Sequence, residues 1–209
     1  MANRIGGVLG GALLFVLLAT HAASGSHRKL AADGCQTVWE AISTQKDYTY
    51  LTDALLSTGL AEVLDQQQLD LTLLAPSDTV WDETLPKYGL DTADLIANMT
   101  DNQDLWAFHI VRRTIFYSTI LNNLGPYNAV TFPTLFPFNR MTFIYRNSSE
   151  NIYVVGYQGK SVLRTFKDNQ GNNPNLCSGR LYRTDVILLP NLDYTSDSDS
   201  LPDLAEMNF

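Results

Sequence analysis

TLLAPSDTVW, at residues 72–81, is the segment from which the fold prediction starts. The preceding and overlapping stretch 69–75 is apolar and predicts a buried strand. Pro76 ends this strand because proline has no backbone N–H to donate. Ser77 is a residue type that commonly caps helices, so we expect a helix from there through Leu85. A buried strand that leads directly into a helix is therefore the first predicted unit.

Outward from this segment, the pattern is helical before residue 117 and strand-like after it. Helices are expected at residues 37–43, 51–56, 92–99 and 101–111, the second of them capped by Asp47 or Thr49. Strands are expected at residues 141–145, 152–156, 162–166 and 181–189, which are rich in β-branched and aromatic residues. Helices followed by strands predict an α+β fold, in which an antiparallel sheet is covered by helices.

Composition limits the class of protein. The chain has 209 residues, of which 45% are hydrophobic and 17% charged, which is enough to bury one core and excludes a wholly disordered chain. The formal net charge is −8. Such a charge repels phosphate backbones, so we do not expect a nucleic-acid partner.

The N-terminal segment predicts export from the cell, and the C-terminal segment predicts an unanchored product. Residues 7–20 are apolar but shorter than the roughly 20 residues of a membrane-spanning helix, and they follow the positive Arg4. We therefore predict a signal peptide at residues 1–24 and an N-terminal arm at 25–34, with an uncleaved membrane anchor as the alternative. Residues 191–209 alternate Ser with Asp and predict a disordered acidic tail, with no lipid-anchor signal and no transmembrane segment. The expected location is extracellular.

Secretion affects the interpretation of the two cysteines and of two glycosylation sequons. Cys35 and Cys177 lack metal-site spacing, and in an oxidising compartment they are expected to form one disulfide worth roughly 4–5 kcal/mol. Two buried free thiols are the alternative. Asn98 and Asn147 each begin an Asn-x-Ser/Thr sequon, so both are predicted to carry N-linked glycans.

The sequence carries no recognisable catalytic or metal-binding signature. Residues 156–161, GYQGKS, have two residues between the glycines where a phosphate-binding loop has four, so they predict a hairpin turn. His109 is the one histidine of the predicted domain, and we expect it to be buried and bonded to the backbone. Asp101 and Asp104 are interpreted as residues that favour helix starts. We predict a non-enzymatic protein with no metal site and no required cofactor.

Apolar and aromatic residues are unusually dense in the first two predicted helices and in the segment that follows them. Part of this set must be core, and the remainder is a hypothesis for a groove that binds an apolar ligand. The candidate residues, to which Val186 of the last strand is added, are Trp39, Ile42, Tyr48, Tyr50, Leu51, Leu55, Leu56, Leu60, Val63, Leu64 and Val186.

Three segments, in order, resemble motifs of the fasciclin domain of extracellular adhesion and matrix proteins. They are TLLAPSDTVW at 72–81, LWAFHIV at 105–111 with Phe108 in place of a tyrosine, and GRLYRTDVILLP at 179–190 with Tyr182 in place of a histidine. The resemblance covers residues 35–190 and implies a wedge-like or sandwich-like sheet with helices packed against it. It assigns structural roles to four motif residues, which are Pro76, Asp78, His109 and Asp185.

The segment CQTVWEAIS at residues 35–43, together with the two cysteines, is similar to the single-domain secreted fasciclins of green algae. Some members of that group are water-soluble proteins that bind astaxanthin. The resemblance therefore implies a carotenoid ligand near the first two helices, held for solubilisation and photoprotection. The alternative is an adhesion module of the extracellular matrix or cell wall, with a protein or glycan partner.

Overall fold

The computed structural model describes residues 34–118, 120, 129–136, 140–146 and 151–190. Its helices are α1 (Val38–Ser43), η1 (Lys46–Tyr48), α2 (Thr49–Ser57), α3 (Leu60–Leu64), α4 (Asp78–Thr84), η2 (Leu85–Tyr88), α5 (Thr92–Ala97) and α6 (Gln103–Phe108). Its strands are β1 (Thr72–Pro76), β2 (Ile110–Val111), β3 (Ala129–Pro133), β4 (Arg140–Arg146), β5 (Asn151–Val155), β6 (Lys160–Thr165) and β7 (Arg180–Thr184). None of these helices has the length and apolar character needed to cross a membrane. The predicted signal peptide, the arm up to residue 33, the acidic tail and Asn147 lie outside the described residues.

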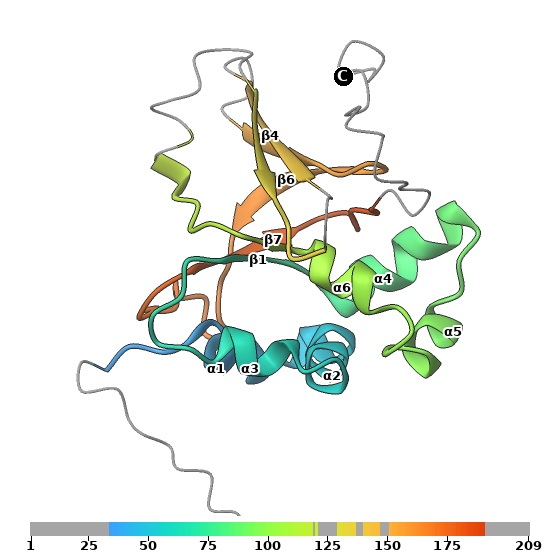
Figure 1. Ribbon diagram of the computed structural model, residues 1–209, viewed down its shortest axis with the longest axis horizontal. Coiled ribbons are helices and arrows are strands. Elements are labelled where there is room, and N and C mark those ends of the chain that lie inside the picture. The colour runs from blue at the N-terminus through green and yellow to red at the C-terminus, as the bar shows by residue number, and fades with distance from the viewer. Residues whose placement is uncertain (1–33, 119, 121–128, 137–139, 147–150, 191–209) are drawn as a thin grey trace, which may run out of the picture. The chain divides into compact units, whose positions relative to one another are not determined.

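The seven described strands form one mixed sheet in the order β2-β1-β7-β6-β5-β4-β3 (Figure 1). The prediction of a wholly antiparallel sheet is wrong at one pair, since β1 and β7 run parallel, from Thr72 beside Arg180 to Pro76 beside Thr184. The other pairs are antiparallel. Val111 also bridges to Thr134 just beyond β3, so the two edges of the sheet approach each other.

The β1–β7 pair separates two hydrophobic cores. Leu73 and Leu181 belong to a core that includes buried residues of α1, α2 and α3, and these helices lie together on one side of the pair (Figure 1). Leu74 and Tyr182, the next residue on each strand, belong to a second core with the buried side chains of β4, β5 and β6. This alternation follows from the two-residue period of a strand. It makes the pair the shared wall of both cores.

The predicted disulfide is confirmed, and it lies beside the start of β7. Cys35 and Cys177 are bonded across 142 residues of sequence. Beside this bond, the backbone oxygen of Gln36 accepts the Cys177 N–H at 2.9 Å, and the Gln36 N–H donates to Asn175 O at 2.8 Å. The first described residues of the domain are thereby tied to the loop that leads into β7.

The helix predicted at residues 101–111 ends earlier than expected. α6 stops at Phe108, and Ile110 and Val111 form β2, which pairs with β1. The exposed edge of β1 accounts for the difference, because its backbone groups need partners and β-branched residues suit a strand. The hairpin prediction for residues 156–161 is confirmed, since the turn lies between β5 and β6 and Gly156 N–H donates to Gly159 O at 3.1 Å.

The start of α2 is capped by a residue of another helix that is remote in sequence, and the predicted caps Asp47 and Thr49 do not serve this role. The carboxylate of Asp78, at the first residue of α4, accepts the Thr49 and Tyr50 N–H groups at 3.0 Å each. These two donors have no partner within their own helix. Asp78 therefore joins the strand-to-helix segment at residues 72–81 to the helix that fills the first core.

We predict that Asp78→Ala destabilises the domain by about 1–2 kcal/mol, because two helix N–H groups lose a charged acceptor. The free energy of unfolding in urea measures the effect. Glu62→Ala on α3, an exposed carboxylate that makes no contact of this kind, is the control and should change stability by less than about 0.5 kcal/mol. Equal effects of the two substitutions would contradict the capping role.

Candidate functional site

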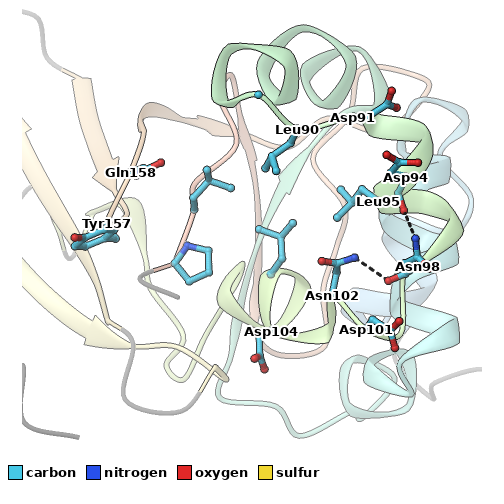
Figure 2. A pocket seen from close by; sticks show the side chains of 14 residues that line it. Leu90, Asp91, Asp94, Leu95, Asn98, Asp101, Asn102, Asp104, Tyr157 and Gln158 are labelled. Atoms are coloured by element: carbon cyan, nitrogen blue, oxygen red, sulfur yellow. Dashed lines mark hydrogen bonds between the residues drawn. The ribbon is translucent and has the colours of Figure 1, made fainter. Parts of the chain in front are cut away.

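A hollow of about 760 Å³ opens at one end of the domain, where several elements terminate. Its walls come from residues 89–91 after η2, from α5, from the turn that leads into α6, from the β5–β6 turn and from residues 189–190. Figure 2 shows Asp94, Asn98 and Asp101 along one side and Tyr157 and Gln158 on the opposite side. We call this the acidic hollow.

The β5–β6 turn is held in place by backbone contacts with the closing segment. The N–H groups of Tyr157 and Gln158 donate to Leu189 O at 3.0 and 3.2 Å, and Leu189 N–H donates back to Gln158 O at 2.8 Å. Gly159 has φ +92°, and a Cβ there would lie 2.6 Å from Ile187 O. Only glycine permits this close approach, which positions Tyr157 on the wall of the hollow.

The charge of the acidic hollow has one sign. Its lining contains four aspartates and no lysine or arginine, and the aspartates are Asp91, Asp94, Asp101 and Asp104. Asp91 accepts the Ala93 N–H at 2.7 Å as the cap of α5. The other three have no ion-pair partner among the described residues. The hollow therefore presents an unneutralised negative field to a ligand.

The interior of the same hollow is apolar. Leu95 and Leu105 are buried beneath it, whereas Leu90 and Tyr157 are 45% and 42% exposed. These two are among the few large hydrophobic side chains in the described part of the chain that are exposed to solvent. A cavity with apolar walls and a polar rim is typical of a binding site.

Two asparagines complete the side of the hollow that carries the aspartates. Asn98 donates from Nδ2 to Asp94 O at 2.9 Å, and Asn102 donates from Nδ2 to Asn98 O at 2.8 Å (Figure 2). Asn98 is exposed, and its glycosylation stays a prediction. Asn147, the other predicted glycan site, lies outside the described residues.

The acidic hollow was not among the sequence predictions. Asp101 and Asp104 were interpreted only as helix-start residues, and Asp104 does lie in the first turn of α6. A signal was present, because residues 88–111 contain four aspartates and no Lys or Arg. Within the described residues, no three His, Cys, Asp or Glu side chains come together as metal ligands.

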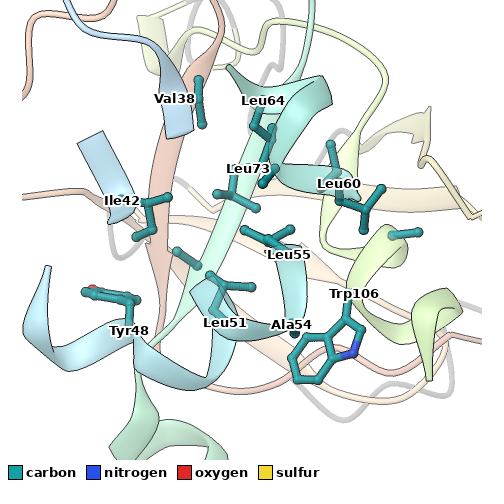
Figure 3. Packing of buried hydrophobic residues seen from close by; sticks show 14 of the residues in the cluster. Val38, Ile42, Tyr48, Leu51, Ala54, Leu55, Leu60, Leu64, Leu73 and Trp106 are labelled. Atoms are coloured by element: carbon teal, nitrogen blue, oxygen red, sulfur yellow. The ribbon is translucent and has the colours of Figure 1, made fainter. Parts of the chain in front are cut away.

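The predicted ligand-binding residues lie elsewhere, and most of them are core. Figure 3 shows Ile42, Leu51, Leu55 and Leu64 among the buried side chains that gather around Leu73 of β1. Six are buried, and these are Ile42, Tyr48, Leu51, Leu55, Leu60 and Leu64. Four are half-buried, and these are Trp39, Tyr50, Val63 and Val186. Leu56 is 58% exposed.

None of the eleven residues lines the acidic hollow or the second hollow described below. The six buried ones belong to the core around β1 and come from α1, η1, α2 and α3. Tyr48 illustrates the environment, since its ring centroid lies 5.3 Å from that of Phe166 and burial raises the pKa of Tyr48 to about 12. A helix face that is buried in a core has the same apolar period as one that lines a groove, so sequence alone did not separate the two.

Three of the four motif residues bond to neighbouring elements. Pro76 pairs with Thr184 across the parallel strands, and Asp78 caps α2 as described. Asp185 accepts from Arg164 Nε at 3.0 Å and lies 3.6 Å from Arg183 Nε. These contacts are structural and leave no reactive group facing either hollow.

His109, the fourth motif residue, is fully buried between α6 and β2. Its Nδ1–H donates to Leu105 O at 2.9 Å, which leaves Nε2 as the acceptor facing the Leu188 N–H at 3.5 Å. Its ring centroid lies 5.6 Å from that of Trp81. Burial lowers the pKa of His109 from 6.5 to about 4, so the imidazole is neutral at physiological pH.

Comparison with known proteins agrees with this arrangement of motifs. A family model of the fasciclin domain matches residues 46–172. The chain belongs to the fasciclin domain family. Fasciclin domains are generally non-enzymatic adhesion modules of extracellular or cell-surface proteins.

Among solved structures, the fasciclin domain is similar to a FAS1 domain pair from the insect cell adhesion molecule fasciclin I. The sequence identity is 17% and the TM-score is 0.47. The alignment covers 66% of this chain and 43% of that chain, so this chain spans less than half of the domain pair. No curated protein matches the chain.

The buried histidine makes the stability of the fasciclin domain pH-dependent. Its pKa is lower in the folded state, so as the pH falls the unfolded chain takes up the proton first. The contribution of His109 to the free energy of unfolding is complete above pH 6.5. It decreases by about 3 kcal/mol as the pH falls toward 4. We expect His109→Gln to lose this part of the pH dependence.

The free energy of unfolding in urea is measured for the unmodified chain and for His109→Gln between neutral pH and pH 4. The quantity compared is the slope of this free energy against pH. The comparison isolates His109, because both proteins carry the same carboxylates. Parallel slopes would show that the pKa of His109 is the same in the folded domain as in the unfolded chain.

Proposed function

We propose that this fasciclin domain is a non-enzymatic, extracellular adhesion-type module that acts by binding a protein or glycan partner. The observation that carries the proposal is the match of the fasciclin family model over residues 46–172. Export through a signal peptide at residues 1–24 is part of the proposal.

The acidic hollow is the proposed contact surface for a basic segment of a partner protein. Its aspartates attract lysine and arginine, and the exposed Leu90 and Tyr157 offer contact area to an apolar side chain. The tail at residues 191–209 carries five acidic and no basic residues, so charge repulsion disfavours it as the occupant. A partner with alternating cationic and aliphatic side chains satisfies both features of the hollow.

We expect a short peptide of alternating leucine and lysine or arginine to bind the full chain, and its glutamate counterpart not to bind. The combined change Asp94→Asn, Asp101→Asn and Asp104→Asn should weaken binding about tenfold, or about 1.4 kcal/mol. Fluorescence anisotropy measures the affinity, which should also fall with rising salt as the charges are screened.

The matched control removes the same three charges outside the hollow, through Asp53→Asn, Glu62→Gln and Glu83→Gln, all of them exposed. This variant should bind the basic peptide as the unmodified chain does, within about twofold. If both triple variants weaken binding equally, the attraction is a property of the net charge and the hollow is not the site.

A second candidate function is the solubilisation of a carotenoid such as astaxanthin for photoprotection. It rests on the resemblance to the single-domain secreted fasciclins of green algae. The exposed Leu56 and the half-buried Trp39 and Tyr50 favour it, since they leave apolar surface on α1 and α2. Against it, six of the candidate residues are filled core and the two helices pack on β1. Adhesion is therefore the preferred function.

Mixing the purified chain with astaxanthin separates the two functions. We expect no coloured species to co-elute with the protein on size exclusion, because Leu51 and Leu55 are fully buried in the core and offer no surface to a rigid polyene. A stoichiometric coloured complex, abolished by Leu56→Asp but not by the triple aspartate change in the acidic hollow, would instead establish the carotenoid function.

A further inference from the structure

We infer that a second hollow, of about 570 Å³, binds a carboxylate-bearing saccharide through Arg180. Its lining comes from residues 116–118, the end of β6, the loop at 173–176 and the start of β7. It shares no residue with the acidic hollow. The inference deepens the proposed binding role and rests on it, but because it concerns different residues its test succeeds or fails separately.

Arg180 is the only cation in this lining, and it is pre-organised. Its Cζ lies 4.0 Å from the ring centroid of Phe116, and its Nη1–H donates to Gly179 O at 2.6 Å. Among the described residues, the ion pairs involve Arg164 and Arg183, and none involves Arg180. Stacking on the Phe116 ring holds the planar guanidinium group of Arg180 in one orientation. Its remaining N–H groups are therefore available to bind a carboxylate through two hydrogen bonds.

The wall that supports Phe116 is fixed by Tyr182. The Tyr182 hydroxyl accepts the Tyr117 N–H at 3.0 Å and donates to Ile115 O at 2.9 Å, so its hydrogen-bonding capacity is used internally. Phe116, between these two contacts, is 43% exposed and is backed by a segment that cannot move freely. The aromatic ring therefore serves as a rigid support for Arg180 and as contact surface for a ligand.

The loop at 173–176, another part of the lining, is held beside the disulfide. Gln36 N–H donates to Asn175 O at 2.8 Å, and Cys177 N–H donates to Gln36 O at 2.9 Å, beside the Cys35–Cys177 bond. The side chains of Asn173 and Asn175 on this loop are exposed. Amides both donate and accept hydrogen bonds, which suits the hydroxyl groups of a sugar.

The chemistry of the lining favours a saccharide over an acidic peptide. The lining holds one cation and no carboxylate, and its other polar side chains are neutral amides and hydroxyls. An acidic peptide with several carboxylates would leave all but one unpaired in a chain of net charge −8. A uronic acid unit carries one carboxylate among hydroxyl groups, which matches this set.

The probe is a tetrasaccharide that carries one galacturonic acid unit among neutral sugars, titrated calorimetrically into the full chain with its disulfide intact. We expect binding that is weakened at least about tenfold when its carboxylate is methyl-esterified and to a similar extent by Arg180→Gln. Arg180→Lys keeps the positive charge but removes the planar guanidinium group, so it should give an intermediate loss of affinity for the saccharide. This conservative variant also serves as the test if Arg180→Gln does not fold.

Arg112→Gln is the matched control, since Arg112 is exposed, carries the same charge and lines neither hollow. It should bind the tetrasaccharide as the unmodified chain does. The triple aspartate variant of the acidic hollow should also keep saccharide binding while it loses the basic peptide. Equal binding of the methyl ester, unchanged binding by Arg180→Gln, tighter binding of tetraglutamate, or no saccharide binding would each overturn the inference.

Discussion

Strands β1 and β7 pair in parallel, residues 72–76 beside residues 180–184, although more than a hundred residues of sequence separate them. Alternate side chains of the pair enter two different cores, with Leu73 and Leu181 on one face and Leu74 and Tyr182 on the other. Closing so long a loop is entropically unfavourable, and the Cys35–Cys177 disulfide reduces that loss near the start of β7. The helices, the remaining strands and both hollows are built outward from this pair.

Because both faces of the pair are covered by core, little space remains between α1, α2, α3 and the sheet. Residues such as Ile42 and Leu55 are fully buried there and cannot face a ligand without disrupting the core. Hollows form instead where elements end. The acidic hollow lies at the ends of η2, α5 and β5, and the second hollow lies beside the loop that precedes β7. The proposed binding surfaces and the core are therefore separate in this fasciclin domain.

Local patterns predicted much of the fold. The strand-to-helix unit around Pro76, the 156–161 hairpin and the buried, backbone-bonded His109 follow from residue type and spacing, and all three are present. Features that depend on long-range pairing were not predicted. The parallel direction of β7, the strand at Ile110–Val111 and the capping of α2 by Asp78 all require knowledge of which segments meet. The acidic hollow was missed for the same reason, because α5 and the β5–β6 turn are distant in sequence.

A module that holds two components together needs two separate contacts. The charge distribution of this domain offers two candidate surfaces for such contacts. The acidic hollow holds four aspartates without a cation, and the second hollow holds Arg180 without a carboxylate. Each hollow attracts the charge that the other repels, so two different partners do not compete for one surface. Under the two proposals, a domain organised in this way would bridge a basic protein segment and an acidic saccharide.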